Sequence, residues 1–323
     1  MTPSKDSKVF IAGHNGMVGS AIKRRLEKAG YNNILTAERS GLDLIDQHEV
    51  RDFIFYNKPD VVIDCAAKVG GIHSNNSYRA DFIYENLQIQ NNLIHYSHLY
   101  GVKKFLFLGS SCIYPKFSDQ PIKEEYLLRS PLEYTNEPYA IAKITGIKMC
   151  ENYYKQYGSN FMSLMPTNLY GPNDNFHLEN SHVLPGLMRK FHEAFVYNYK
   201  KVKVWGTGKA KREFLHVDDL AYACKFILEN VNAEDIYSQN ISHINVGSGT
   251  DISIANLAHK LANLTKYTGE IEFELDKPDG TLRKLMSNSR MKKFGWKPKI
   301  NLDEGLEMTY KWYRENENNI RSF

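Results

Sequence analysis

Short apolar runs alternate with amphipathic stretches over the first half of the chain. The runs are rich in β-branched and aromatic residues, and they cover residues 8–13, 33–37, 60–67, 104–110 and 161–167. The stretches between them are long enough for helices. Strands separated by helices form right-handed crossover units, and such units build a parallel sheet. The pattern therefore predicts an α/β fold with a doubly wound parallel sheet.

The regularity weakens after residue 172. Glycine, proline, asparagine and histidine are frequent in residues 168–186, which is typical of a long functional loop. Further strands and helices are expected at 201–206, 218–231, 243–247, 253–265, 270–273 and 303–316. A chain of this length favours two domains. We predict a first domain from residues 1–172 with a return segment near 214–247, and a smaller α/β domain from mainly residues 173–323.

Composition excludes several classes of protein. The 323 residues are 42% hydrophobic and 24% charged, and the net charge of +4 comes from basic residues interleaved with acids. This surface argues against a nucleic-acid partner, and no apolar run is long enough to cross a membrane. The polar start lacks the core of a secretion signal, so we expect a cytoplasmic protein. The four cysteines are scattered without a CxxC pair, which predicts free thiols and no metal site.

Three glycines separate the first predicted strand from its helix: Gly13, Gly16 and Gly19. Glycine lets the backbone approach a pyrophosphate, and the free N–H groups of a helix N-terminus bind the anion. The spacing GxxGxxG is a weak signal when it stands alone. Its place between a strand and the amphipathic residues 21–30 predicts a dinucleotide site in a Rossmann domain.

The end of the second strand predicts which dinucleotide binds. An acidic side chain there accepts the ribose 2'-hydroxyl of NAD, whereas an arginine accepts the 2'-phosphate of NADP. Glu38 and Arg39 are adjacent and favour different cofactors. We favour Arg39 and therefore NADP(H).

A tyrosine and a lysine four residues apart point to acid–base chemistry. Asn136 is expected to cap a helix in which Tyr139 and Lys143 share one face. A phenol is a poor acid or base at neutral pH until a neighbouring ammonium stabilises its phenolate. Most such pairs are ordinary surface pairs. Together with the glycine loop and Ser110 at a strand end, this pair predicts an acid–base site beside a nicotinamide.

These features resemble the extended short-chain dehydrogenases/reductases, and the resemblance spans nearly the whole chain. Longer strings resemble, more narrowly, the GDP-L-fucose synthase family. They are CAAKVGGI, LGSSCIYPK, NEPYAIAK, MPTNLYGPNDNFH, NSHV, REFLHVDD and KPDGTLRK.

The resemblance implies a two-part reaction that converts GDP-4-keto-6-deoxy-D-mannose to GDP-L-fucose: epimerisation at C3 and C5, then reduction at C4 with NADPH. It implies that Tyr139 donates a proton to the C4 oxygen, that Ser110 hydrogen-bonds this oxygen, and that Lys143 binds the nicotinamide ribose. Cys112 and His182 would handle the protons of epimerisation, since thiol and imidazole titrate near neutral pH. Taken alone, Cys112 would more readily be a small buried hydrophobic residue and His182 a loop histidine.

The pattern and the resemblance together imply the binding residues. Those for the cofactor are Gly13, Asn15, Gly16, Met17, Val18, Gly19, Arg39, Asp43, Leu44, Ala66, Ala67, Lys68, Leu108, Gly109, Ser110, Tyr139, Lys143, Pro166, Thr167, Asn168, Leu169 and His182. Those for the GDP-sugar are Lys190, Trp205, Arg212, Asp279 and Lys284. A homodimer through helices near residues 78–100 and 139–157 is a further implication. Asn15 is a departure, because the family often has a basic residue there, and it argues against a strict preference for NADP.

Three alternatives share part of these features. A dehydratase of the same superfamily needs carboxylates after the strand-end serine, and the sequence SCI that follows Ser110 supplies none. Another sugar-nucleotide epimerase or reductase of the same superfamily shares the fold and the Tyr139–Lys143 pair, and a 4-epimerase would keep a tightly bound NAD+. A redox-sensing Rossmann protein without catalytic activity has no need for Ser110, Tyr139 and Lys143 together.

Overall fold

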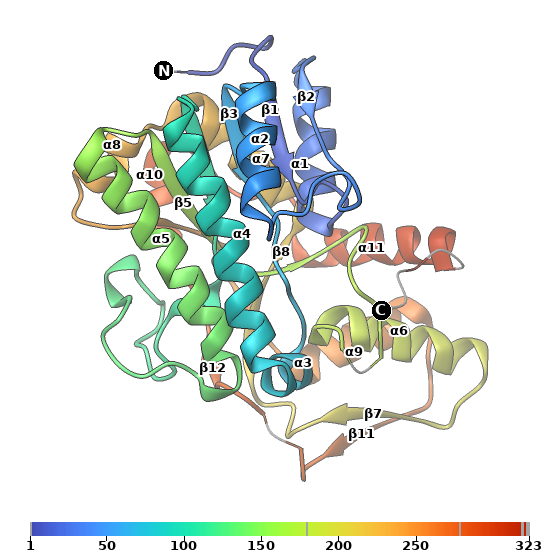
Figure 1. The fold of residues 1–323 in the computed structure, drawn as a ribbon. Coiled ribbons are helices and arrows are strands. Elements are labelled where there is room, and N and C mark those ends of the chain that lie inside the picture. Colours follow the sequence, from blue (N-terminus) through green and yellow to red (C-terminus); the bar gives the residue numbers. More distant parts are fainter. Residues whose placement is uncertain (1, 179, 278, 318–319, 321–323) are drawn as a thin grey trace.

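A six-stranded sheet with the order β2-β1-β3-β4-β5-β9 forms the centre of the molecule (Figure 1). The structure is a computed structural model and describes residues 2–178, 180–277, 279–317 and 320. Every neighbouring pair in this sheet is parallel. The strands are β1 (Val9–Ala12), β2 (Ile34–Leu35), β3 (Val61–Asp64), β4 (Lys104–Leu108), β5 (Phe161–Pro166) and β9 (Ile244–Val246). The predicted doubly wound parallel sheet is confirmed.

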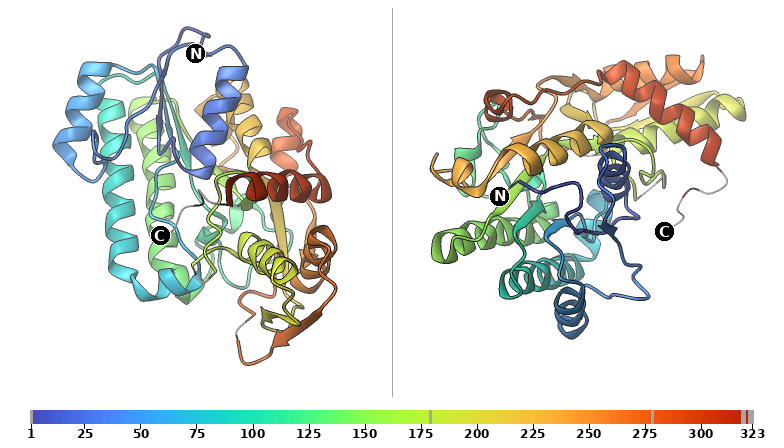
Figure 2. Two further views of the ribbon diagram at one scale, coloured as in Figure 1. Left: turned by 90° about the vertical axis from the view of Figure 1, so that its right-hand side faces the viewer. Right: turned by 90° about the horizontal axis from the view of Figure 1, so that it is seen from above.

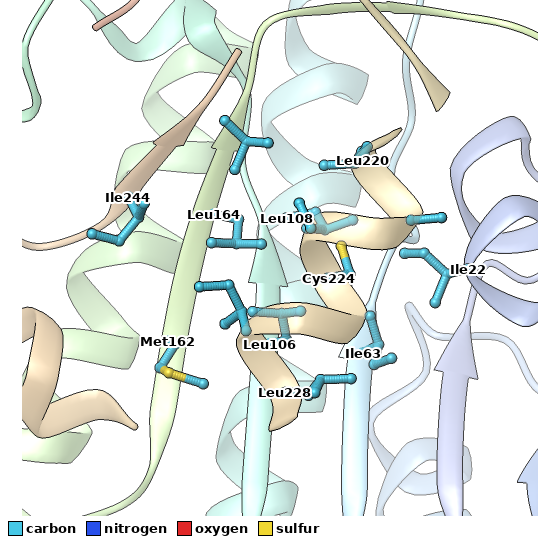
Figure 3. Packing of buried hydrophobic residues seen from close by; sticks show 14 of the residues in the cluster. Ile22, Ile63, Leu106, Leu108, Met162, Leu164, Leu220, Cys224, Leu228 and Ile244 are labelled. Carbon is cyan, nitrogen blue, oxygen red and sulfur yellow. The ribbon is translucent and has the colours of Figure 1, made fainter. Parts of the chain in front are cut away.

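Helices cover both faces of this sheet (Figure 2). The helices on one face are α1 (Met17–Lys28) and α7 (Val217–Asn230), and those on the other are α2 (Gln47–Asn57), α4 (Arg79–Leu99) and α5 (Glu137–Tyr157). Successive side chains of a strand point to opposite faces. Ile63 therefore packs with Leu106 and Cys224 under α7 (Figure 3), whereas Val62 packs with Phe107 under α4 and α5.

Most of the second half of the chain forms a smaller part of the molecule (Figure 1). Strand β8 (Lys211–His216) pairs with three short strands, β6 (Asn168–Tyr170), β10 (Asp251–Ser253) and β12 (Arg283–Lys284). A parallel pair is made by β7 (Lys201–Trp205) and β11 (Glu270–Glu274). A third apolar core lies among α6 (Val183–Val196), α9 (Ile254–Thr265) and α11 (Leu302–Asn316). Of these elements, α6, α9, β7 and β11 lie below the large sheet in Figure 1.

Short helical segments complete the fold. They are α3 (Ile72–Ser77), α8 (Ala233–Tyr237), α10 (Ser289–Phe294), η1 (Ser111–Ile113), η2 (Glu124–Tyr126) and η3 (Tyr134–Asn136). The return segment near 214–247 contains β9, which is a strand of the large sheet, and α7, which packs on one face of that sheet. The exact division of the chain into two domains stays a prediction.

The expected cap of α5 is wrong in one respect. Asn136 occupies the N-cap position, but its side chain makes no capping hydrogen bond. Its backbone, with φ −120° and ψ 13°, is not in the extended conformation from which a side chain reaches the free N–H groups. The Asn136 Oδ1 atom is instead buried without a hydrogen-bond partner among the described residues.

Candidate active site

The loop after β1 can hold a dinucleotide because its glycines have no side chains. Gly13 has a φ of +78°, and a Cβ atom on it would lie 2.9 Å from the backbone of Ala66. A Cβ on Gly19 would lie 2.2 Å from the Gly13 carbonyl oxygen. Gly16 is the N-cap of α1, so the first N–H groups of this helix lack an intrahelical acceptor. Two other expected cofactor residues lie in this first turn, Met17 and Val18. The loop therefore fits a pyrophosphate on the helix N-terminus.

The side chains next to this loop bear on the choice of cofactor. Asn15 Nδ2 donates a hydrogen bond of 2.7 Å to Glu38 Oε2, and His14 Nε2 lies 3.4 Å from Glu38 Oε1. The hydrogen bond from Asn15 lowers the pKa of the Glu38 carboxyl, so this group is ionised at neutral pH. Arg39 is exposed beside it. An acid and an arginine thus stand together at the edge where the adenosine ribose of a dinucleotide belongs.

The other expected cofactor residues lie at or after the carboxyl ends of the strands. They are Asp43 and Leu44 after β2, Ala66, Ala67 and Lys68 after β3, Leu108, Gly109 and Ser110 at β4, and Pro166, Thr167, Asn168 and Leu169 at β5 and β6. These ends share one edge of the parallel sheet, which is where ligands of such sheets bind. Lys68 Nζ is held by Glu85 at 2.5 Å. Thr167 and Asn168 are tied to the smaller part of the molecule, because both donate to the Glu213 carbonyl oxygen.

Tyr139 and Lys143 lie on α5 at the end of β4. The Lys143 side chain is 3% exposed, and its Nζ donates to the Leu108 carbonyl at 2.9 Å. Nζ lies 5.9 Å from the centroid of the Tyr139 ring. Burial lowers the pKa of Lys143, and the charge of Asp64 opposes this. Burial raises the pKa of Tyr139 well above its usual value, while a hydrogen bond with Ser110 opposes the rise.

These shifts differ from the expectation that Lys143 mainly stabilises a phenolate. Desolvation is the largest influence on the phenol, and the Lys143 ammonium is directed at a backbone carbonyl. Tyr139 therefore holds its proton at neutral pH. A protonated phenol beside Ser110 is suited to donating a proton to an oxygen that gains negative charge.

Lys284 links the two residues expected to act in epimerisation. Cys112, in η1, is buried, and burial raises the pKa of its thiol, while the charge of Lys284 and a hydrogen bond with Ser110 oppose the rise. His182 is the N-cap of α6 and is exposed as a whole residue, and desolvation of its imidazole and then the charge of Lys284 lower the pKa of this ring. The structure thus places the Lys284 ammonium within electrostatic reach of both the thiol and the imidazole.

The residues expected to bind the GDP-sugar form a second group that Lys284 joins to the first. Arg212 of β8 and Lys284 of β12 are paired in register. The Arg212 guanidinium donates to the carbonyl oxygens of Thr281, at 2.5 Å, and Asp279, at 3.2 Å. The Asp279 carboxylate accepts two bonds of 2.7 Å from the backbone and hydroxyl of Thr207. Asp279 therefore holds its own loop beside β7, and its contact with the ligand stays a prediction.

Trp205 and Lys190 are the other two residues expected to bind the GDP-sugar, and they lie close to each other. The Trp205 ring is 49% exposed, and Lys190 Nζ lies 5.8 Å from its centroid. Lys190 Nζ also donates to the Lys203 carbonyl at 3.2 Å. An exposed aromatic face next to an ammonium offers stacking and charge to a ligand that carries a base and phosphates.

Sequence reasoning missed polar residues that line a cavity beside Cys112 and Lys284. Among them, Lys116 and Glu133 form an ion pair of 2.8 Å, and the unpartnered Asn136 lines the same cavity. The charge of Glu133 also acts on Lys284. Lys116 is the last residue of the string LGSSCIYPK, but nothing in the sequence pattern connects it with Glu133.

The part of the chain that the structure describes offers neither a metal site nor a membrane span. Residues 2–178, 180–277, 279–317 and 320 contain no group of three or more His, Cys, Asp or Glu side chains placed to hold a metal ion. In the same part of the chain, no helix has the length and apolarity needed to cross a bilayer.

Comparison with known proteins gives consistent matches. The NAD dependent epimerase/dehydratase family matches residues 9–247. A putative GDP-L-fucose synthase 2 of Arabidopsis thaliana is 56% identical over 312 residues, 97% of this chain and 93% of the relative. The GDP-L-fucose synthase of Escherichia coli K12 is 52% identical over 318 residues, 97% of this chain and 98% of the relative. The solved structure of a GDP-mannoheptose C4 reductase from Campylobacter jejuni with NADP bound has a TM-score of 0.88 and 40% identity, over 97% of this chain and 99% of the other.

Proposed function

This chain belongs to the NAD dependent epimerase/dehydratase family and, within it, to the GDP-L-fucose synthases, and we propose that it converts GDP-4-keto-6-deoxy-D-mannose to GDP-L-fucose. The conversion combines 3,5-epimerisation with reduction at C4, and the cofactor is NADP(H). The observation that carries the proposal is the joint presence of two proton-handling groups, Cys112 and His182, around Lys284 beside the Tyr139 acid. A simple C4 reductase needs the last of these but not the first two.

In the proposed epimerisation, Cys112 and His182 exchange protons at the carbons that flank the ketone. The C3 and C5 protons are acidic because their loss gives an enolate that shares its charge with the C4 oxygen. One group removes a proton from carbon and the other returns one to the opposite face. The positive charge of Lys284 favours the thiolate form of Cys112, which accepts a proton from carbon, and lowers the pKa of His182, so that its imidazolium returns a proton more readily.

In the proposed reduction, Tyr139 donates its proton to the C4 oxygen and Ser110 hydrogen-bonds the same oxygen. NADPH, when bound at the glycine loop, supplies a hydride to C4. The buried ammonium of Lys143 holds the nicotinamide ribose. Its positive charge also stabilises the phenolate that Tyr139 becomes after it has donated its proton. Arg212, Lys190 and Trp205 are proposed to hold the GDP moiety, with cations at the diphosphate and the indole at the base.

The direct test is an incubation with GDP-4-keto-6-deoxy-D-mannose and NADPH. Loss of absorbance from the nicotinamide together with GDP-L-fucose as the sugar product supports the proposal. Reduction to a GDP-6-deoxyhexose with unchanged C3 and C5 would instead make this protein a C4 reductase without epimerase activity.

Cofactor choice gives a first prediction. Arg39→Ala is expected to weaken the binding of NADPH by ~1.5–3 kcal/mol and to leave the binding of NADH nearly unchanged, because only NADPH carries a 2'-phosphate for a charge-assisted bond. Glu38→Gln is the comparison variant with the opposite expected effect, since it removes a negative charge next to that phosphate but keeps a side-chain oxygen for Asn15. It is expected to strengthen the binding of NADPH and to weaken the binding of NADH. Titration of both reduced cofactors by fluorescence measures the four constants.

The outcome that contradicts this assignment is equal weakening of both cofactors by Arg39→Ala. Glu38 would then be the ribose contact, and the chain would bind the cofactor in the manner typical of NAD.

A homodimer through α4 and α5 is a further proposal. Both helices lie on the outer face of the large sheet, and they expose large apolar side chains, namely Tyr84, Leu99, Ile141 and Tyr157. A second copy would cover them. Sedimentation at micromolar concentration tests this, and a single species of 37 kDa would refute it. The cytoplasmic location stays a prediction.

A further inference from the structure

A buried carboxylate, Asp64, lies next to the proposed acid–base pair, and none of the steps above uses it. Asp64 ends β3 and is paired in register with Phe107 of β4. Side chains alternate along a strand, so Asp64 points to the same face as Val62 and Phe107, the face that α4 and α5 cover. Lys143 Nζ lies 4.7 Å from the centroid of the Phe107 ring. The Asp64 side chain and the Lys143 ammonium therefore lie on the same face of the sheet, at the Asp64–Phe107 pair.

Asp64 has no exposed surface and few partners. Its Oδ1 accepts a hydrogen bond of 3.1 Å from the backbone N–H of Ala66. Its Oδ2 is buried and has no hydrogen-bond partner among the described residues. A buried carboxylate is strongly unfavourable unless a charge or hydrogen bonds compensate it. Lys143 is the cation whose charge acts on Asp64.

The other titratable groups around this pair do not supply positive charge. Tyr139 and Cys150 lie on α5 and Cys65 on the loop after β3, and the charge of Asp64 raises the pKa of all three. Cys112, in η1, faces Lys143. Each of these groups is neutral when protonated, so Lys143 carries the positive charge among the groups that face Asp64.

We propose that Asp64 is the buried counter-charge of Lys143, a positioning residue that keeps both Lys143 and Tyr139 protonated. An aspartate in this place opposes the loss of the lysine proton and the loss of the phenol proton at once, because both losses leave the site more negative. The kinetic part of the test rests on the proposed function, whereas the unfolding part does not.

Asp64→Asn keeps the shape of the side chain and removes its charge. Both Tyr139 and Lys143 should then lose protons at lower pH, so the alkaline limb of kcat/KM for ketone reduction is expected to move down by about one pH unit. Asp174→Asn is the matched control, since Asp174 is also buried and, among the described residues, its Oδ2 has no hydrogen-bond partner and no lysine acts on its charge. Its alkaline limb should stay where it is in the wild type. An unmoved limb in Asp64→Asn overturns the proposal.

Urea unfolding at pH 8 tests the pair without catalysis. The pKa of Asp64 is raised to about 6, so its carboxyl is ionised at this pH. Lys143→Met leaves that charge uncompensated and should lower the unfolding midpoint strongly. The same change in the Asp64→Asn background should lower it much less. Additive effects in this cycle would show that the two groups do not interact, and would overturn the proposal even if the wild type reduced no keto sugar.

Discussion

Tyr139→Phe is expected to lower the rate of C4 reduction by ~10²–10⁴, the effect typical of losing a general acid. The phenylalanine ring keeps the contacts of the tyrosine ring, including the edge contact with Phe82, and removes the hydroxyl that donates the proton. Cofactor binding should persist, because the glycine loop and Lys143 are unchanged. Steady-state kinetics with the keto sugar, together with a fluorescence titration of NADPH, separates the two effects.

Tyr153→Phe is the matched control for this prediction. Tyr153 lies on the same helix, and its hydroxyl hydrogen-bonds His95 at 2.9 Å, away from the candidate site. The Tyr153→Phe variant should therefore reduce the ketone at the normal rate. Near-normal turnover of Tyr139→Phe would remove Tyr139 from its proposed role and leave Lys143 or water as the proton source.

Cys112→Ser and His182→Gln are expected to abolish most epimerisation and spare reduction. A hydroxyl ionises far less readily than a thiol, and a carboxamide neither accepts nor returns a proton at neutral pH. In D2O, the wild-type product should carry deuterium at C3 and C5. Both variants should give a GDP-6-deoxyhexose with unchanged C3 and C5 and little deuterium there, which NMR of the product measures.

Cys224→Ser controls for the loss of a thiol elsewhere. Cys224 lies on α7 and is buried in the core on the other face of the sheet (Figure 3). The Cys224→Ser variant should therefore leave deuterium incorporation unchanged. If Cys112→Ser and His182→Gln both made GDP-L-fucose with deuterium at both carbons, the epimerase roles would be wrong. Cys112 would then be a packed thiol, as its burial alone suggests.

The parallel sheet and the glycine loop could be predicted because their signals are local. Apolar runs between helical stretches give the strands, and the spacing of Gly13, Gly16 and Gly19 after the first run gives the turn. The chain order of Ser110, Tyr139 and Lys143 follows from motifs in the same way. The Asn136 side chain was mispredicted because capping depends on the backbone angles at that residue, which the preceding η3 turn sets.

The sequence by itself determined the fold class and the family, since strand runs, glycine spacing and motif strings are properties of neighbouring residues. Only the tertiary structure decided which charges act on which groups. Lys284 lies more than 100 residues from His182 in the chain, yet its charge reaches both His182 and Cys112 because β12 pairs with β8. The charges of Asp64 and Lys143 act on each other because β3 and β4 are neighbours under α5. Electrostatic effects depend on distance and burial in space, and neither quantity is written in the local sequence.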